Sequence, residues 1–209
     1  LLLGKTTIAL SATIGDSTIF SQESGIKGSF LTVAPSFPPE HTCICMPTDT
    51  PNLAFNERKR GTVTNVMRRM ARASKKLASK GIRTLHVVVS NEERVRLIEI
   101  MAEEGVNAIS YGNGVTARDA AQRFKNGEAD ALIGTAQHFG EGIDLPRQVA
   151  GVIFGLRPAY PPPDAPRTQF EERRYGNQRW AIWNWRVMLS VLQWRGRNIR
   201  SDDDLGVTI

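Results

Sequence analysis

The feature that most constrains this chain is an alternation, from Gly81 onward, of short β-branched runs and longer stretches of helical periodicity. The runs expected to form strands cover residues 84–89, 106–111, 129–135 and 151–156. Residues 91–104 and 116–125 repeat apolar side chains every three or four positions, which places those side chains on one helical face. Parallel strands need such crossover helices between them. The sequence therefore predicts an α/β fold with a mostly parallel central sheet between helices.

The remaining segments have weaker patterns. A further helix is expected over the apolar positions from Val63 to Leu77. Residues 15–57 are rich in Ser, Thr and Pro, and only residues 41–46 within them are expected to form a strand. Residues 157–167 contain five prolines and are expected to form a loop.

A long helical segment is expected over residues 169–201, with a break near Gly176. Its large apolar residues recur at spacings of three and four and form one stripe: Trp180, Trp183, Val187, Val191 and Trp194. Such a stripe belongs more often to a core than to a base-stacking platform, so core packing is the favoured interpretation.

The two ends of the chain, residues 7–10 and 207–209, are strand-like, and we interpret the chain as a fragment of a longer protein. No apolar run approaches the roughly 18 residues that span a bilayer. The first residues also lack the basic and apolar regions of a signal peptide. We therefore expect a location in the cytoplasm, nucleoid or nucleus.

The net charge of +6 comes from 27 Lys and Arg against 21 Asp and Glu, and it favours polyanionic partners. Basic residues are densest between Arg58 and Lys80, where the solvated face of a surface helix is the simpler interpretation. Cys43 and Cys45 form a C-x-C pair whose side chains would share one strand face. Two thiols alone cannot complete a four-ligand metal site, so we expect buried free thiols in a reducing compartment.

Gly4-Lys5-Thr6 has the end of a phosphate-binding loop but lacks the remainder of that motif, and a strand pattern follows where a helix is required. We therefore reject a phosphate loop at this position. No metal site is expected within the chain.

The strongest local motif is Gln193-Trp-Arg-Gly-Arg-Asn-Ile-Arg200. On a helix, Gln193, Arg197 and Arg200 would share one face, and Gly196 would let a ligand approach the backbone. Arginine forks bind phosphate oxygens, so the motif is suited to clamping a polyphosphate. A solvated basic helix end is an equally good interpretation of this motif alone.

Two further motifs lie at expected strand ends. Gly140-Glu-Gly-Ile-Asp-Leu-Pro146 follows the strand near residues 131–135, at the position where doubly wound sheets bind ligands, although an ordinary turn is the alternative. Ser11-Ala12-Thr13 follows the strand-like residues 7–10 and could relay hydrogen bonds, but the tripeptide alone is uninformative.

The order of these motifs resembles the C-terminal helicase domain of the XPD/DinG branch of superfamily 2 ATP-dependent DNA helicases. The resemblance extends from Ser11 to Ile209. It rests on five segments in order: Ser-Ala-Thr-Ile at 11–14, a strand ending in Ser90, Phe124 to Pro146, the proline-rich loop, and Gln193 to Arg200 followed by Asp204-Leu-Gly206. Trp194 and Arg195 depart from the family pattern, which has smaller or apolar residues there.

The resemblance implies a RecA-like three-layer sandwich, with residues 1–15 ending a first motor domain and residues 16–209 forming the second. It also implies a role for each motif. The catalytic residues would be Arg197 and Arg200, as arginine fingers, with Gln193. ATP binding would involve Glu141, Gly142, Asp144 and Gly196, coupling would involve Ser11, Ala12 and Thr13, and nucleic-acid binding would involve Ser90 and Thr135.

The implied activity is ATP-driven translocation on DNA with unwinding, as in helicases of DNA repair. The implied cofactor is ATP with Mg²⁺, whose ligands are expected in the first motor domain. Single-stranded and duplex DNA and that first domain are the implied partners. A non-enzymatic nucleic-acid-binding or regulatory module and an RNA helicase are the alternatives. The isolated chain, which has neither a complete phosphate loop nor a D-E-x-H box, is expected to be inactive.

Overall fold

The computed structural model describes residues 8, 10–11, 13–34, 37–54, 61–139, 143, 145, 149–197, 199 and 202–209. The chain divides into two compact units, each of which is described by itself. Residues 33–159 and 193–209 form the sheet unit. Residues 1–32 and 160–192 form the helical unit.

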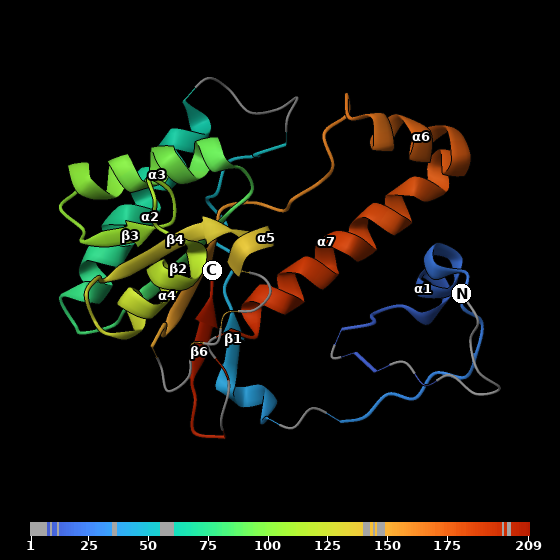
Figure 1. Cartoon of the computed structure of the whole chain (residues 1–209), viewed down its shortest axis with the longest axis horizontal. Coiled ribbons are helices and arrows are strands. Elements are labelled where there is room, and N and C mark those ends of the chain that lie inside the picture. The colour runs from blue at the N-terminus through green and yellow to red at the C-terminus, as the bar shows by residue number, and fades with distance from the viewer. Residues whose placement is uncertain are drawn as a thin grey trace. The chain divides into compact units, whose positions relative to one another are not determined.

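The sheet unit is built on six parallel strands (Figure 1). They are β1 (Thr42–Ile44), β2 (Thr84–Val88), β3 (Ala108–Ser110), β4 (Ala131–Thr135), β5 (Val152–Gly155) and β6 (Gly206–Thr208). Their order is β1-β6-β5-β2-β4-β3, and every pairing is parallel. The predicted α/β fold with a parallel sheet is confirmed. Because all strands run the same way, their carboxyl ends meet at one edge of the sheet.

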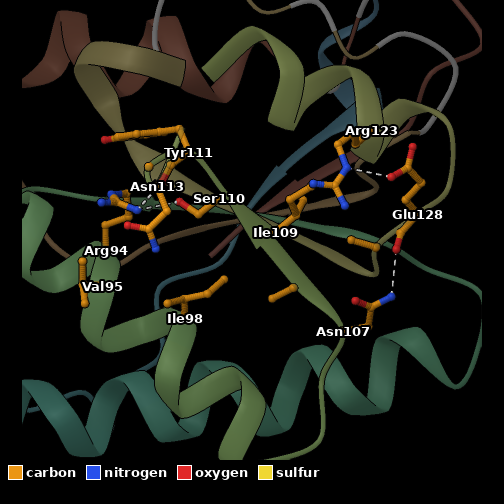
Figure 2. Close-up of a pocket in the computed structure, with 13 residues that line it drawn as sticks. Arg94, Val95, Ile98, Asn107, Ile109, Ser110, Tyr111, Asn113, Arg123 and Glu128 are labelled. Carbon is orange, nitrogen blue, oxygen red and sulfur yellow. Dashed lines mark hydrogen bonds and ion pairs between the residues drawn. The ribbon is translucent and has the colours of Figure 1, made fainter. Parts of the chain in front are cut away.

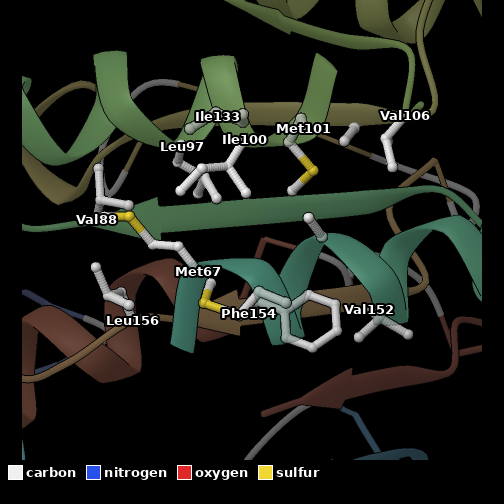
Figure 3. Close-up of a cluster of buried hydrophobic side chains, with 13 residues drawn as sticks. Met67, Val88, Leu97, Ile100, Met101, Val106, Ile133, Val152, Phe154 and Leu156 are labelled. Carbon is white, nitrogen blue, oxygen red and sulfur yellow. The ribbon is translucent and has the colours of Figure 1, made fainter. Parts of the chain in front are cut away.

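The three longer helices of the sheet unit were predicted from the sequence, and its two shortest helical elements were not. The sheet unit contains the helices α2 (Thr62–Ala78), α3 (Asn91–Glu103), α4 (Ala117–Lys125) and α5 (Ala136–Phe139) and the 3₁₀ turn η1 (Pro39–His41). Figure 3 shows the core between the sheet and the pair α2 and α3, a cluster that includes Met67, Leu97 and Phe154 of β5. Successive strand residues point to opposite faces, so residues such as Leu132 pack on the other face.

A histidine is buried within this core. The Nε2 atom of His86 lies 2.8 Å from the Oγ of Ser74 and 3.0 Å from the Oγ1 of Thr84, and its ring stacks on Phe154. Burial lowers the pKa of His86 to about 3, because a charged imidazolium would lose its hydration. This histidine is therefore a neutral core residue.

On the face of the sheet opposite to α2 and α3, two glycines make room for aromatic rings. A Cβ atom on Gly134 would clash with the ring of Phe139, and one on Gly155 would lie 2.7 Å from the indole of Trp194. Trp194 departs from the family pattern, and the bare backbone of Gly155 is what accommodates its ring.

The helical unit contains α1 (Ser17–Ser24), α6 (Pro166–Tyr175), the 3₁₀ turn η2 (Gly176–Gln178) and most of α7 (Arg179–Arg195). Asp16 caps α1 by accepting hydrogen bonds from the backbone N–H groups of Thr18 and Ile19. The break predicted near Gly176 is the η2 turn between α6 and α7.

A buried carboxylate holds these helices together. Glu171 of α6 accepts hydrogen bonds from Arg167, from the indole of Trp183 and from Arg186, and Arg186 also pairs with Glu23 of α1. Burial tends to raise the pKa of Glu171, but the hydrogen bonds from the two arginines and the tryptophan outweigh it and lower the pKa to about 2. Glu171 therefore stays ionised and joins three helices.

Several sequence-based expectations were wrong. The predicted helix over residues 169–201 ends at Arg195, one residue before Gly196, so Arg197 does not share a helical face with Gln193. Glycine is a poor helix former, which favours an end at this position. Ile8 and Leu10, expected within a strand, are exposed and outside any strand.

The thiols of Cys43 and Cys45 are exposed, whereas burial was expected. Their sulfur atoms lie 3.4 Å apart, as expected for one strand face. The tryptophan stripe is only partly core, because Trp183 and Trp194 are buried while Trp180 is half exposed. No helix within the described part of the chain is long and apolar enough to cross a bilayer.

Candidate nucleotide and nucleic-acid site

Ser90 follows β2 at the carboxyl edge of the sheet and begins α3. Its Oγ accepts a hydrogen bond from the backbone N–H of Glu93, whose carboxylate in turn accepts from the N–H groups of Val89 and Ser90. Arg157, which follows β5, pairs with the other oxygen of Glu93 at 2.8 Å. This capping box fixes the start of α3, and the first N–H groups of a helix are suited to binding phosphate.

Thr135 is the last residue of β4 and lies at the same edge, where it is buried within a polar network. Its Oγ1 lies 3.1 Å from the hydroxyl of Tyr111 and 2.9 Å from the Nδ1 of His138. The Tyr111 ring stacks on His138 with centroids 4.3 Å apart, and its hydroxyl donates to Asn91. Thr135 therefore holds the two rings in place at the strand ends.

Sequence reasoning missed Tyr111, His138 and Asn91. Each follows a strand within a few residues, and the rule that ligands bind at the carboxyl ends of parallel strands could have identified them. The guanidinium carbon of Arg94 lies 4.4 Å from the centroid of the Tyr111 ring, which adds a cation above the aromatic face.

A cavity of about 440 Å³ lies along the edge strand β3 (Figure 2). Arg94 and Asn113 lie at one end, and Arg123, paired with Glu128, lies at the other. Arg94 donates to the hydroxyl of Ser110 and to the carbonyl of Tyr111. The cavity is thus lined by polar groups that already bond to one another.

The motif beginning at Gln193 lies where α7 ends. The backbone N–H of Arg197 donates to the carbonyl of Trp194 across a turn that includes Gly196. The Nη1 atom of Arg197 donates to the carbonyl of Ile143 at 3.0 Å. The guanidinium of Arg197 therefore contacts the segment after β4, so two motifs that are far apart in the sequence meet at one place.

The other residues predicted to form the site are not seen beside Arg197 or Thr135. Ser11 and Thr13 belong to the helical unit, where the Oγ of Ser11 accepts a hydrogen bond from the N–H of Thr13. The predictions for other positions, and the rejected phosphate loop, lie outside the described residues: Gly4, Lys5, Thr6, Ala12, Glu141, Gly142, Asp144 and Arg200.

The described geometry shows what chemistry is available. Arg197 is a permanent cation beside the backbone of the segment after β4, where it could bind phosphate oxygens. Within the described ranges, no group of three or more His, Cys, Asp or Glu side chains could hold a metal ion.

Residues 63–209 match the helicase C-terminal domain family. A structure of XPD without ligand has a TM-score of 0.64 at 17% identity, and the match covers 92% of this chain and 41% of that one. S. cerevisiae Dbp5 bound to RNA and ADP–BeF₃ has a TM-score of 0.46 at 15% identity, with 73% and 32% covered. No curated protein sequence matched the chain.

At these identities the structural likeness establishes the fold alone, which is that of a RecA-like helicase domain. The family match covers well over half of the chain, and the chain belongs to the helicase C-terminal domain family. The predicted resemblance to the C-terminal helicase domain of the XPD/DinG type is thereby confirmed. The chain spans less than half the length of the solved structures reported above.

Proposed function

We propose that this chain is the second motor domain of an ATP-dependent DNA helicase, in which it supplies arginine fingers and one wall of the single-strand groove. The observation that carries the proposal is the hydrogen bond from Arg197 to the carbonyl of Ile143. It joins the motif after α7 to the motif after β4, as a shared nucleotide site requires.

On the nucleotide side, Arg197 and Arg200 would contact the terminal phosphate of ATP, with Gln193 beside them. Charge builds on the transferred phosphoryl group, and a fixed guanidinium stabilises it without reorganisation. Glu141, Gly142, Asp144 and Gly196 would approach the nucleotide from the same side. Bound Mg²⁺ would neutralise phosphate charge, and its ligands would come from the first motor domain.

On the nucleic-acid side, Ser90 and Thr135 lie at the carboxyl ends of neighbouring strands, β2 and β4. The capped start of α3 would present backbone N–H groups to a phosphate of the bound strand. Ser11, Ala12 and Thr13 would couple hydrolysis to movement. ATP would close the cleft between the two motor domains and hydrolysis would open it.

The proposal is tested by strand displacement with the complete protein. We expect it to separate a short DNA duplex that carries a single-stranded tail when ATP and Mg²⁺ are present, and not with a non-hydrolysable ATP analogue. The isolated chain should neither hydrolyse ATP nor displace a strand, because it lacks a phosphate loop and a D-E-x-H box.

Three results would contradict parts of the proposal. Displacement from RNA-tailed substrates alone would make the protein an RNA helicase. Binding of DNA without ATP-dependent displacement would make it a non-enzymatic binding module. Rapid ATP turnover by the isolated chain would contradict the proposal that the ATP site lies between two motor domains.

A further inference from the structure

One aromatic side chain on α6 and one on α7 are exposed although large rings usually avoid water. Phe170 of α6 is 58% exposed and Trp180 of α7 is 51% exposed. The Trp180 ring packs edge-on against the buried Trp183, with centroids 5.1 Å apart. The indole N–H of Trp183 donates to Glu171 at 2.8 Å, so the exposed ring rests on an immobilised one.

Arginines alternate with these rings. On α6, Arg167 and Arg174 lie three positions before and four positions after Phe170, which places all three on one helical face. Arg174 lies 5.3 Å from the ring of Tyr175, and Arg179 lies 5.4 Å from the ring of Trp180. Exposed aromatic rings and exposed guanidinium groups therefore recur along residues 167–180, whereas the side chain of Arg179 is only 17% exposed.

The two glutamates of α6 are already used within the unit. Glu171 is buried and bonded to two arginines, and Glu172 pairs with Arg179 at 2.9 Å. Within the described part of the chain, no ion pair within 4 Å is found for Arg173 or Arg174. The surface therefore has positive charge that is not neutralised by its own carboxylates.

We propose that this α6–α7 surface is a stacking platform for single-stranded nucleic acid, with bases on Trp180 and Phe170 and phosphates on Arg173 and Arg174. Base stacking on aromatic rings and a basic track for the backbone are the two features that single-strand binding requires. The inference rests on the proposed function, and it adds a contact surface outside the sheet unit.

The test measures binding of a fluorescently labelled 20-nucleotide oligo(dT) by the complete protein without ATP. Trp180→Ala should weaken binding by about 5- to 100-fold, because one stacked base is lost, while Trp180→Phe should bind within a few-fold of wild type. Met188→Ala is the matched control, since Met188 is also partly exposed on α7 but has no ring.

The charge contribution is tested separately with the Arg173→Ala, Arg174→Ala double variant. Loss of two phosphate contacts should reduce the slope of log affinity against log salt by about 1.4. An oligonucleotide that contains 5-bromouracil should crosslink on irradiation to the peptide that includes Trp180. This readout reports contact and does not depend on the stability of a variant.

The outcomes separate the two proposals. If the wild-type protein fails to bind the oligonucleotide, the proposed function fails together with the platform. If the wild type binds, but Trp180→Ala and Phe170→Ala bind equally well and crosslinks map elsewhere, only the platform is overturned.

Discussion

Single residues explain how the chain accommodates its departure from the family pattern. Trp194 occupies a position where a smaller or apolar residue was expected, and its ring fits because Gly155 has no side chain. The carbonyl of Trp194 accepts a hydrogen bond from the backbone N–H of Arg197. The position of Trp194 therefore also affects the position of Arg197, the proposed arginine finger. The sequence showed the unusual tryptophan but could not show which glycine faced it.

Gly155→Ala tests this dependence. The new Cβ would lie 2.7 Å from the indole, so Trp194 must shift. We expect the free energy of unfolding to fall by about 1–3 kcal/mol and ATP turnover of the complete protein to decrease. Denaturant unfolding and a phosphate-release assay measure the two effects.

Gly28→Ala is the control for that substitution, because a Cβ at Gly28 meets no atom within 4 Å. Combining Gly155→Ala with Trp194→Leu should restore part of the stability, since the smaller side chain removes the clash. Stability equal to wild type in Gly155→Ala would show that the ring has room to move.

At the scale of elements, the parallel sheet and its crossover helices were predictable because their periodicities differ. The strands at residues 84–88 and 131–135 are fully buried and have the continuous apolar runs of such strands. The end of α7 was not predictable in the same way. Gln193, Arg197 and Arg200 keep a helical spacing in the sequence, but α7 ends at Arg195, just before Gly196, and glycine is a poor helix former.

The candidate site was predictable only where a motif has a characteristic spacing. Arg197 and Thr135 lie in such motifs, whereas Tyr111 and His138 come from β3 and α5 and meet only after the sheet has formed. The exposure of Trp180 could not be predicted from the sequence either. Tryptophans on one helical face have the same spacing whether or not another element covers them.

The three-helix junction at Glu171 has a predictable pH dependence. Its pKa of about 2 lies below the 4.5 of an exposed glutamate, so the unfolded state binds the proton more readily. The stability from this carboxylate is complete above about pH 4.5 and is lost as the pH falls toward 2. Glu171→Gln should lower the free energy of unfolding at pH 7 by on the order of 3 kcal/mol.

Unfolding of the wild type and of Glu171→Gln should therefore converge as the pH falls from 4.5 to 2. Glu99→Gln is the control, because Glu99 forms an exposed ion pair with Arg96 and should have little effect at any pH. A difference at Glu171 that stays constant down to pH 2 would rule out an ionised carboxylate as its cause.

At the scale of the whole molecule, the chain is one wall of a proposed active site. Its family membership defines the fold and the class of motor, and Arg197 is the described side chain through which it would act on ATP. The central claim is that this arginine acts on the transition state of hydrolysis and not on the binding of DNA.

DNA-stimulated ATP turnover by the complete protein carrying Arg197→Ala, measured beside its affinity for single-stranded DNA, tests that claim most directly. Arg96→Ala is the control, since Arg96 is a surface arginine of α3 that pairs with Glu99. We predict that turnover in Arg197→Ala falls by about 10³-fold or more while DNA affinity stays within a few-fold of wild type. Turnover equal to that of Arg96→Ala would contradict the assignment of Arg197 as an arginine finger.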